Sequence, residues 1–167
     1  TRNDTRTWTS QDIRPGDQVS TRDSGAQEVL WTGARHLSGA RLFAMPHLRP
    51  VRIRAGTIGA GDAGLVVSPE HRLLICGPSA RALFNEAEVL VEARDLLDDR
   101  PIRAETVPRD VTYIHLMTAR HEIVRANGVE TETFHPASAD LHLAGPDERA
   151  ALGLVLGGAG YGAFARR

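Results

Sequence analysis

The sequence contains no lysine and a single cysteine. All 20 basic residues are Arg, and together with 21 acidic residues they give a net charge of −1. This balance provides no electrostatic reason to expect a nucleic-acid partner. One cysteine, Cys76, excludes an internal disulfide framework. A lone cysteine after an apolar strand is typical of a small buried hydrophobic residue, so we expect Cys76 to be structural.

Long hydrophobic segments are also missing. No apolar run approaches the roughly 18 residues that a membrane-spanning helix needs, and residues 1–6 lack the hydrophobic core of a signal peptide. We therefore expect no membrane partner. The chain has 167 residues, of which 41% are hydrophobic and 25% charged. These values fit one globular domain with a substantial core.

Short strand-like segments separated by turns make up most of the sequence. Residues 51–55 alternate apolar and charged side chains, which is typical of a half-exposed strand. An Asn127-Gly128 turn between two strand-like segments is the strongest local signal for a hairpin. The glycines at 56, 59, 61 and 64 predict a flexible loop. Further strands are predicted at 18–19, 27–33, 65–67, 73–76, 88–93 and 111–117, with helical turns at 79–84 and 93–97. The pattern predicts a mainly β fold.

The end of the chain has a different character. Pro146 is followed by two acidic residues, which is the composition of a helix start. Gly157 and Gly158 then end the pattern. We expect a short C-terminal helix that lies outside the β core. The chain would accordingly divide into a domain over residues 1–136 and a C-terminal extension over residues 137–167.

Three of the seven histidines lie where a side chain could do chemistry. His71 follows a Ser68-Pro69 turn at the end of a predicted strand, where rigid backbone can aim the ring, and Ser68 could hydrogen-bond within the same turn. His115 alternates with apolar neighbours, so it would face a cleft or solvent if those neighbours face the core. His121 opens the next strand. Histidine is the natural acid–base group near neutral pH. We assign no function to His36, His47, His135 and His142.

A metal site is a rival use for the same histidines. A metal-dependent hydrolase would bind its ion through His71, His115 and His121. However, six positions separate His115 from His121, and no HExxH or CxxC motif accompanies them. We therefore expect no metal and no cofactor.

The order and spacing of these motifs resemble the Hedgehog/intein (Hint) domains, most closely the bacterial Hint-like group. The resemblance covers about residues 1–136 and implies a compact, horseshoe-like β fold with pseudo-two-fold symmetry. It also implies autocatalytic cleavage at the N-terminus of the domain. The segments that carry it are 12–19 (DIRPGDQV), 50–53 (PVRI), 65–72 (LVVSPEHR), 88–96 (EVLVEARDL), 113–116 (YIHL), 121–124 (HEIV) and 127–129 (NGV).

The resemblance also implies roles for individual residues. In the family, an N-terminal Cys or Ser attacks the preceding carbonyl and forms a thioester or ester. A Thr-x-x-His element, matched by Ser68-Pro69-Glu70-His71, helps to protonate the leaving nitrogen. His115 matches the strand residue that assists proton transfer, and His121 matches a histidine near the start of the following strand. The partner implied is the upstream protein segment itself, in cis.

The sequence departs from the family pattern at its start. Thr1 lies too close to the Pro15-Gly16-Asp17 turn to be the nucleophile, so we expect this chain alone to be incompetent in self-cleavage. It also lacks a terminal His-Asn pair, which argues against full splicing. An alternative is a Hint-fold module that has lost catalysis and serves as a binding or structural domain. In either case we expect a monomer. The sequence leaves the location open, with a secreted or cell-surface place in a larger bacterial protein as one option.

Overall fold

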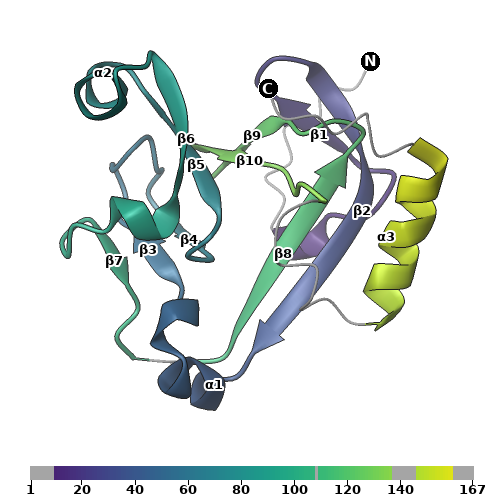
Figure 1. Cartoon of the computed structure of the whole chain (residues 1–167), viewed down its shortest axis with the longest axis horizontal. Coiled ribbons are helices and arrows are strands. Elements are labelled where there is room, and N and C mark those ends of the chain that lie inside the picture. The colour runs from purple at the N-terminus through teal and green to yellow at the C-terminus, as the bar shows by residue number, and fades with distance from the viewer. Residues whose placement is uncertain (1–9, 108, 137–145, 160–167) are drawn as a thin grey trace.

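The computed structural model describes residues 10–107, 109–136 and 146–159, and within these ranges the strands form two antiparallel sheets (Figure 1). The larger sheet has seven strands in the order β6-β5-β10-β9-β1-β2-β8. Its strands are β1 (Gln18–Thr21), β2 (Gly25–Leu37), β5 (Arg72–Cys76), β6 (Glu88–Glu92), β8 (Val111–Thr118), β9 (Ile123–Ala126) and β10 (Val129–Glu132). The prediction of a mainly β fold is confirmed.

The smaller sheet has three strands in the order β4-β3-β7. These are β3 (Val51–Ile53), β4 (Leu65–Val67) and β7 (Ile102–Ala104). The connections contain helices α1 (Gly39–Ala44) and α2 (Pro78–Phe84) and the 3-10 turns η1 (Ser10–Asp12), η2 (Pro46–Leu48) and η3 (Ala93–Leu96). Helix α3 (Pro146–Ala159) follows the sheets in the chain.

The main core lies between the two sheets. Strand β3 buries its apolar positions and exposes Arg52, as its alternating sequence predicts. Its apolar residues pack with side chains of the other small-sheet strands and of β5 and β10. The buried cluster consists of Val51, Ile53, Ala60, Val67, Leu73, Ala93, Ile102 and Val129. The strands β5 and β10, which carry much of the candidate site described below, are therefore anchored in this core.

The glycine-rich connection from β3 to β4 is fixed by the tip of the β9–β10 hairpin. Asn127 and Gly128 form this tip with φ values of 47° and 90°. The Asn127 side-chain amide donates to the Gly64 carbonyl at 3.0 Å, and the Gly61 N–H donates to the Asn127 carbonyl at 2.7 Å. The hairpin was predicted correctly, and the loop that was predicted to be flexible makes these hydrogen bonds to its tip.

Strands β2 and β8 form a long pair that runs side by side (Figure 1). Gly33 of β2 lies opposite His115 of β8. A side chain at position 33 would overlap the indole ring of Trp31, so the glycine leaves room for this ring to lie along the strand. Trp31 then contacts Phe134 with ring centroids 5.2 Å apart. This aromatic surface requires cover from another element.

Helix α3 supplies that cover. It has 14 residues and lies along β2 (Figure 1). Leu152 is 1% exposed and packs in a second cluster with Trp31, Met117 and Phe134. The predicted helix is therefore confirmed, whereas its expected position outside the core is wrong. The spacing of Leu152, Val155 and Leu156 matches one helix face and could have indicated this packing.

We expect Leu152→Ala to destabilise the protein by about 2 kcal/mol, at the low end for a buried leucine because a surface helix can partly close the cavity. Urea unfolding would measure the change in the free energy of unfolding. Leu154→Ala is the matched control, because Leu154 lies two residues away and is 81% exposed. Equal effects of the two substitutions would contradict the packing of α3.

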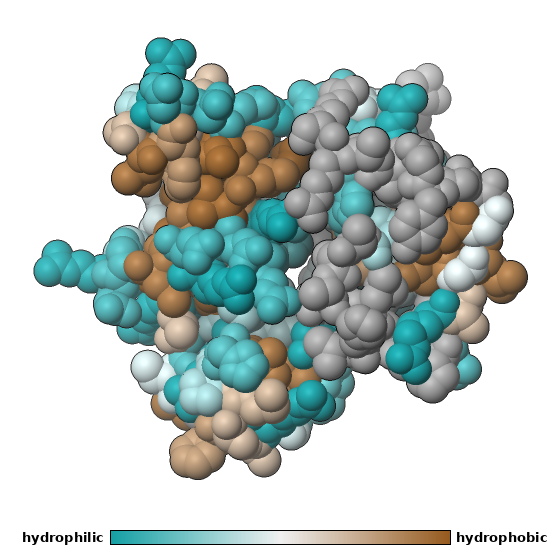
Figure 2. Space-filling model, in the orientation of Figure 1, coloured by the Kyte–Doolittle hydropathy of each residue, from teal (hydrophilic) through white to brown (hydrophobic). Residues whose placement is uncertain are grey.

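Apolar side chains also gather on the outside of the molecule, at the upper left of Figure 2, over α2 and strands β5 and β6. Leu83 is 72% exposed, and Phe84 beside it is exposed as well. In the described part of the chain, no helix combines the length and the apolar character required to cross a membrane.

Candidate functional site

All three candidate histidines contact one short segment, residues 131–135, at and beyond the end of β10. His71 Nε2 is hydrogen-bonded to Thr131 Oγ1. His121 Nε2 lies 2.9 Å from Glu132 Oε2. The ring of His115 packs edge-on against Phe134 with a centroid distance of 5.4 Å. The fold thus brings residues from distant chain positions to a single strand end.

The backbone on both sides of His71 is fixed. The His71 N–H donates to the Ser68 carbonyl at 3.2 Å, which closes the predicted Ser-Pro turn. The His71 carbonyl accepts from the N–H of Ala93 at 2.9 Å. Ser68 itself is buried. The predicted Ser-Pro turn is therefore present, and the Ser68 backbone rather than its hydroxyl closes it.

The hydrogen bonds of Thr131 indicate which nitrogen of His71 carries a proton. The Thr131 hydroxyl donates to the Arg72 carbonyl at 3.1 Å, so its single proton is already used. Thr131 Oγ1 must then accept from His71 Nε2–H. In the neutral ring, Nδ1 consequently holds the lone pair.

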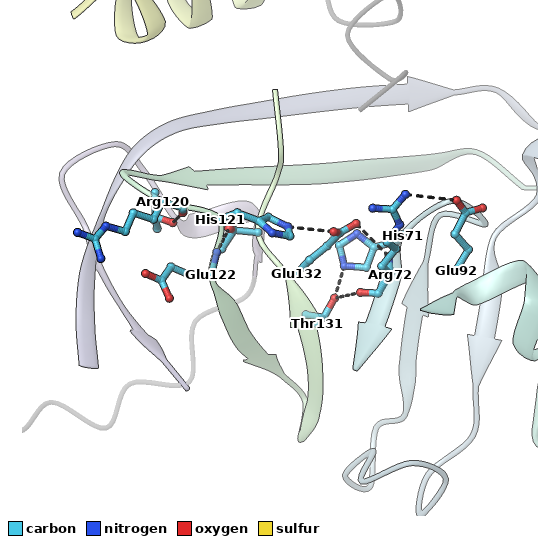
Figure 3. A network of polar contacts seen from close by, with 10 residues as sticks. His71, Arg72, Glu92, Arg120, His121, Glu122, Thr131 and Glu132 are labelled. Atoms are coloured by element: carbon cyan, nitrogen blue, oxygen red, sulfur yellow. Dashed lines mark hydrogen bonds and ion pairs between the residues drawn. The ribbon is translucent and has the colours of Figure 1, made fainter. Parts of the chain in front are cut away.

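Glu132 lies between the two histidine-bearing segments (Figure 3). Its side chain is 13% exposed and that of His121 is 10% exposed. Oε2 accepts from His121, and Oε1 accepts from the backbone N–H of Arg72 at 3.3 Å. Burial raises the pKa of Glu132, but the hydrogen bond from His121 and the positive charges of His71, His121 and Arg72 outweigh it and leave this pKa below its ordinary value. Glu132 is therefore ionised at neutral pH.

Glu132 should make stability depend on pH in the acidic range. Its pKa is lower in the folded state than in the unfolded chain, so its contribution is present above the unfolded pKa and is lost as pH falls through the folded pKa. We expect Glu132→Gln to remove this part of the acid-induced loss. Urea unfolding from pH ~7 to ~3 would measure it. Glu130→Gln is the control, because Glu130 forms an outer pair with the exposed Arg125. Parallel curves for the wild type and Glu132→Gln would contradict the prediction.

The Arg72 side chain turns away from Glu132. Its Nη2 lies 3.8 Å from Glu92 Oε1 on β6 (Figure 3). Glu92 is also bound by Arg94, whose Nη2 lies 2.5 Å from Glu92 Oε2. Arg72 thus offers its backbone N–H to Glu132 while its guanidinium pairs with Glu92.

His115 was expected to face a cleft or solvent only if Ile114 and Leu116 face the core. In β8 it shares a face with Tyr113 and Met117, which are both buried. His115 therefore lies on a face of β8 that meets the core, whereas Ile114 and Leu116 are half-buried and share their face with the buried Thr118. His115 is half-buried against Phe134. Both His71 and His115 contact the 131–135 segment.

Thr131, Glu132 and His135 are site residues that the sequence analysis missed. Thr131 and Glu132 were interpreted as ordinary strand residues, and His135 was assigned no function. His135 lies edge-on to His121 with ring centroids 5.3 Å apart. The hairpin register pairs Glu132 with Ile123, two positions from His121. This register follows from the Asn-Gly turn and could have placed Glu132 near His121. His142 lies outside the described residues.

The rival metal site finds no support in the geometry. In the ranges that the structure describes, no group of three or more His, Cys, Asp or Glu side chains could hold a metal ion.

Cys76 is exposed, so the expectation of a buried cysteine is wrong. It ends β5 at a position that alternates with the buried Ile75. Desolvation raises the pKa of its thiol, Arg22 opposes this effect, and the carboxylates of Glu88 and Glu130 add to it, so the net pKa is above its ordinary value. A thiol with a raised pKa is a poor nucleophile.

Comparison with known proteins agrees with this architecture. Residues 7–138 match the Hint domain family. No curated protein and no solved structure gives a significant match to the chain. The family match spans well over half of the 167 residues and includes the Ser68–His71 turn, His115, His121 and the whole of β10. The chain therefore belongs to the Hint domain family.

Proposed function

We propose that this Hint domain is an autoprocessing domain that rearranges a peptide bond of its own upstream chain by an N-to-S or N-to-O acyl shift. One observation supports this most directly. His71, at the matching position of the Thr-x-x-His element, is fixed by a turn on one side and by Thr131 on the other. An acid–base group must be held in one geometry to act on a scissile bond.

The reaction requires one proton to move from the nucleophile to the leaving nitrogen. The thiol or hydroxyl of a Cys or Ser attacks the preceding carbonyl carbon, and a C–S or C–O bond replaces the C–N bond. The proton lost by the nucleophile ends on the freed amine. His71, whose Nε2–H is bound by Thr131, would deliver this proton to the leaving nitrogen from its doubly protonated ring.

The other histidines would assist from the same strand end. His121 is held by Glu132 and would provide a second imidazole near the site. His115 matches the strand residue that assists proton transfer in the family, and its ring is supported by Phe134. Ser68 would contribute through the turn that positions His71. No metal or cofactor enters this scheme.

A second candidate function is a Hint-fold binding module without catalysis. The exposed apolar surface around Leu83 and Phe84 of α2 favours it, because such residues on a helix face often mark a contact with another protein (Figure 2). This reading needs no nucleophile. It predicts a stable, uncleaved protein.

Mass spectrometry of the natural chain, taken with any residues that its gene encodes ahead of Thr1, would separate the two functions. Autoprocessing predicts scission directly before a Cys or Ser in that region, accelerated by added thiol. The matching Cys→Ala or Ser→Ala variant should stay intact, as should the 167-residue chain alone. An extended chain that stays whole in thiol would favour the binding module.

A further inference from the structure

We propose that Glu132 is a positioning residue that ties the two histidine-bearing segments of the site together. One carboxylate oxygen binds the His121 ring, and the other binds the backbone N–H of Arg72, the residue that follows His71. The inference rests on the proposed function for its role in the reaction. Its structural part, the bond between Glu132 and His121, can be tested without cleavage.

The geometry leaves few other ways to satisfy these groups. Both side chains of the Glu132–His121 pair are nearly buried. A carboxylate is an acceptor only, so His121 must present Nε2–H to it. A hydrogen bond between an ionised carboxylate and an imidazole N–H is stronger than a neutral one. Loss of the carboxylate would leave a buried donor unsatisfied and the His121 ring free to turn.

Glu132 is the carboxylate on β10 that faces this region. Glu130, two residues earlier, pairs instead with Arg125, whose side chain is largely exposed. The charged and titratable groups around Glu132 are His71 and Arg72 from the start of β5 and His121 ahead of β9. His135 lies edge-on to His121. These neighbours are cationic or neutral, so they favour an ionised Glu132.

Two adjacent residues of β10 each bind a different histidine of the site. Thr131 fixes the His71 ring, and Glu132 fixes the His121 ring and the backbone beside His71. Movement of this strand end would disturb both imidazoles together. In the proposed reaction, loss of the carboxylate should slow the acyl shift by about 10–100-fold, the range found when a residue that orients a functional histidine is removed from a metal site.

Proton NMR of the 167-residue chain provides the direct test. A buried imidazole N–H bonded to a carboxylate exchanges slowly with water and resonates at low field. We expect one such resonance in the wild type, assigned to His121 by its loss in His121→Asn. It should disappear in Glu132→Ala and shift upfield in Glu132→Gln, which keeps the side-chain shape but loses the charge. Glu130→Gln should leave it unchanged.

Persistence of the His121 resonance in Glu132→Ala, or no shift in Glu132→Gln, would overturn the inference. Absence of any wild-type resonance traceable to His121 would do the same. If Glu132→Ala does not fold, the shift of the His121 resonance in Glu132→Gln still tests the inference. The two proposals can fail separately. If the His121 resonance changes in the Glu132 variants as expected but the wild-type extended chain is not cleaved, the proposed function is rejected and the structural role of Glu132 is retained. Cleavage at the wild-type rate in Glu132→Gln would reject the positioning role in the reaction alone.

Discussion

His71→Ala in the extended, self-cleaving protein is expected to slow cleavage by about 10²–10⁴-fold, the usual effect of removing a positioned acid–base group. The amine that leaves in an acyl shift is a poor leaving group until it is protonated. In this site the His71 ring is directed by the Ser68 turn and by Thr131. Alanine retains the backbone turn and removes the proton donor. The rate would be followed by gel densitometry and mass spectrometry.

Controls distinguish lost chemistry from lost structure. His36→Ala should cleave at the wild-type rate, because His36 is largely exposed. Its Nε2 lies 3.5 Å from Oδ2 of Asp110, which is also exposed, so the substitution removes only a surface contact. Added imidazole should partly restore cleavage in His71→Ala, because it can supply the missing acid–base group. A His71→Ala protein that melts like the wild type and cleaves at the wild-type rate would remove His71 from the mechanism. Thr131→Val, which replaces the hydroxyl with a methyl group, should show a smaller effect of the same sign.

Local sequence patterns predicted most of the strands. Alternation in Val51–Ile53 and the turn residues at Asn127-Gly128 specify β3 and the β9–β10 hairpin through interactions within a few residues. The short β7 was not predicted. Ile102–Ala104 has only three residues, and it is a strand because β3 pairs with it across about fifty positions of chain. Such pairing leaves little local signal.

The candidate site was predicted only in part, because local patterns identify some of its residues and long-range pairing positions the others. His71 and His121 stand beside recognisable turns and strand starts, so their positions followed from neighbouring residues. The position of Glu132 near His121 could have been derived from the hairpin register, whereas the contact of Thr131 with His71 depends on the pairing of β10 with the distant β5. The direction of His115 depended on which face of β8 is covered. The Trp31 and Phe134 rings and Leu152 of α3 decide this, and they come from three separate parts of the chain.

The hairpin that carries Glu132 depends on one glycine, and Gly128→Ala is expected to destabilise the protein by about 3–5 kcal/mol. Two costs add. Gly128 has a φ of 90°, outside the range that an alanine adopts without strain. A Cβ at this position would also overlap the backbone carbonyl of Gly59, which cannot rotate away as a side chain could. The neighbouring Asn127 holds the β3–β4 loop against the hairpin tip through its bonds to Gly61 and Gly64.

Gly25→Ala separates these two costs. Gly25 has a φ of 68°, but a Cβ there would meet no atom within 4 Å, so only the backbone strain applies and we expect a loss of about 1 kcal/mol. Urea unfolding of both variants would measure the difference. Because Asn127 and Gly128 hold the tip while Thr131 and Glu132 hold the histidines, Gly128→Ala should also weaken the low-field His121 resonance. Equal losses of stability in the two variants would show that the β3–β4 loop moves aside in Gly128→Ala. The contacts between this loop and the hairpin tip would then contribute little to stability.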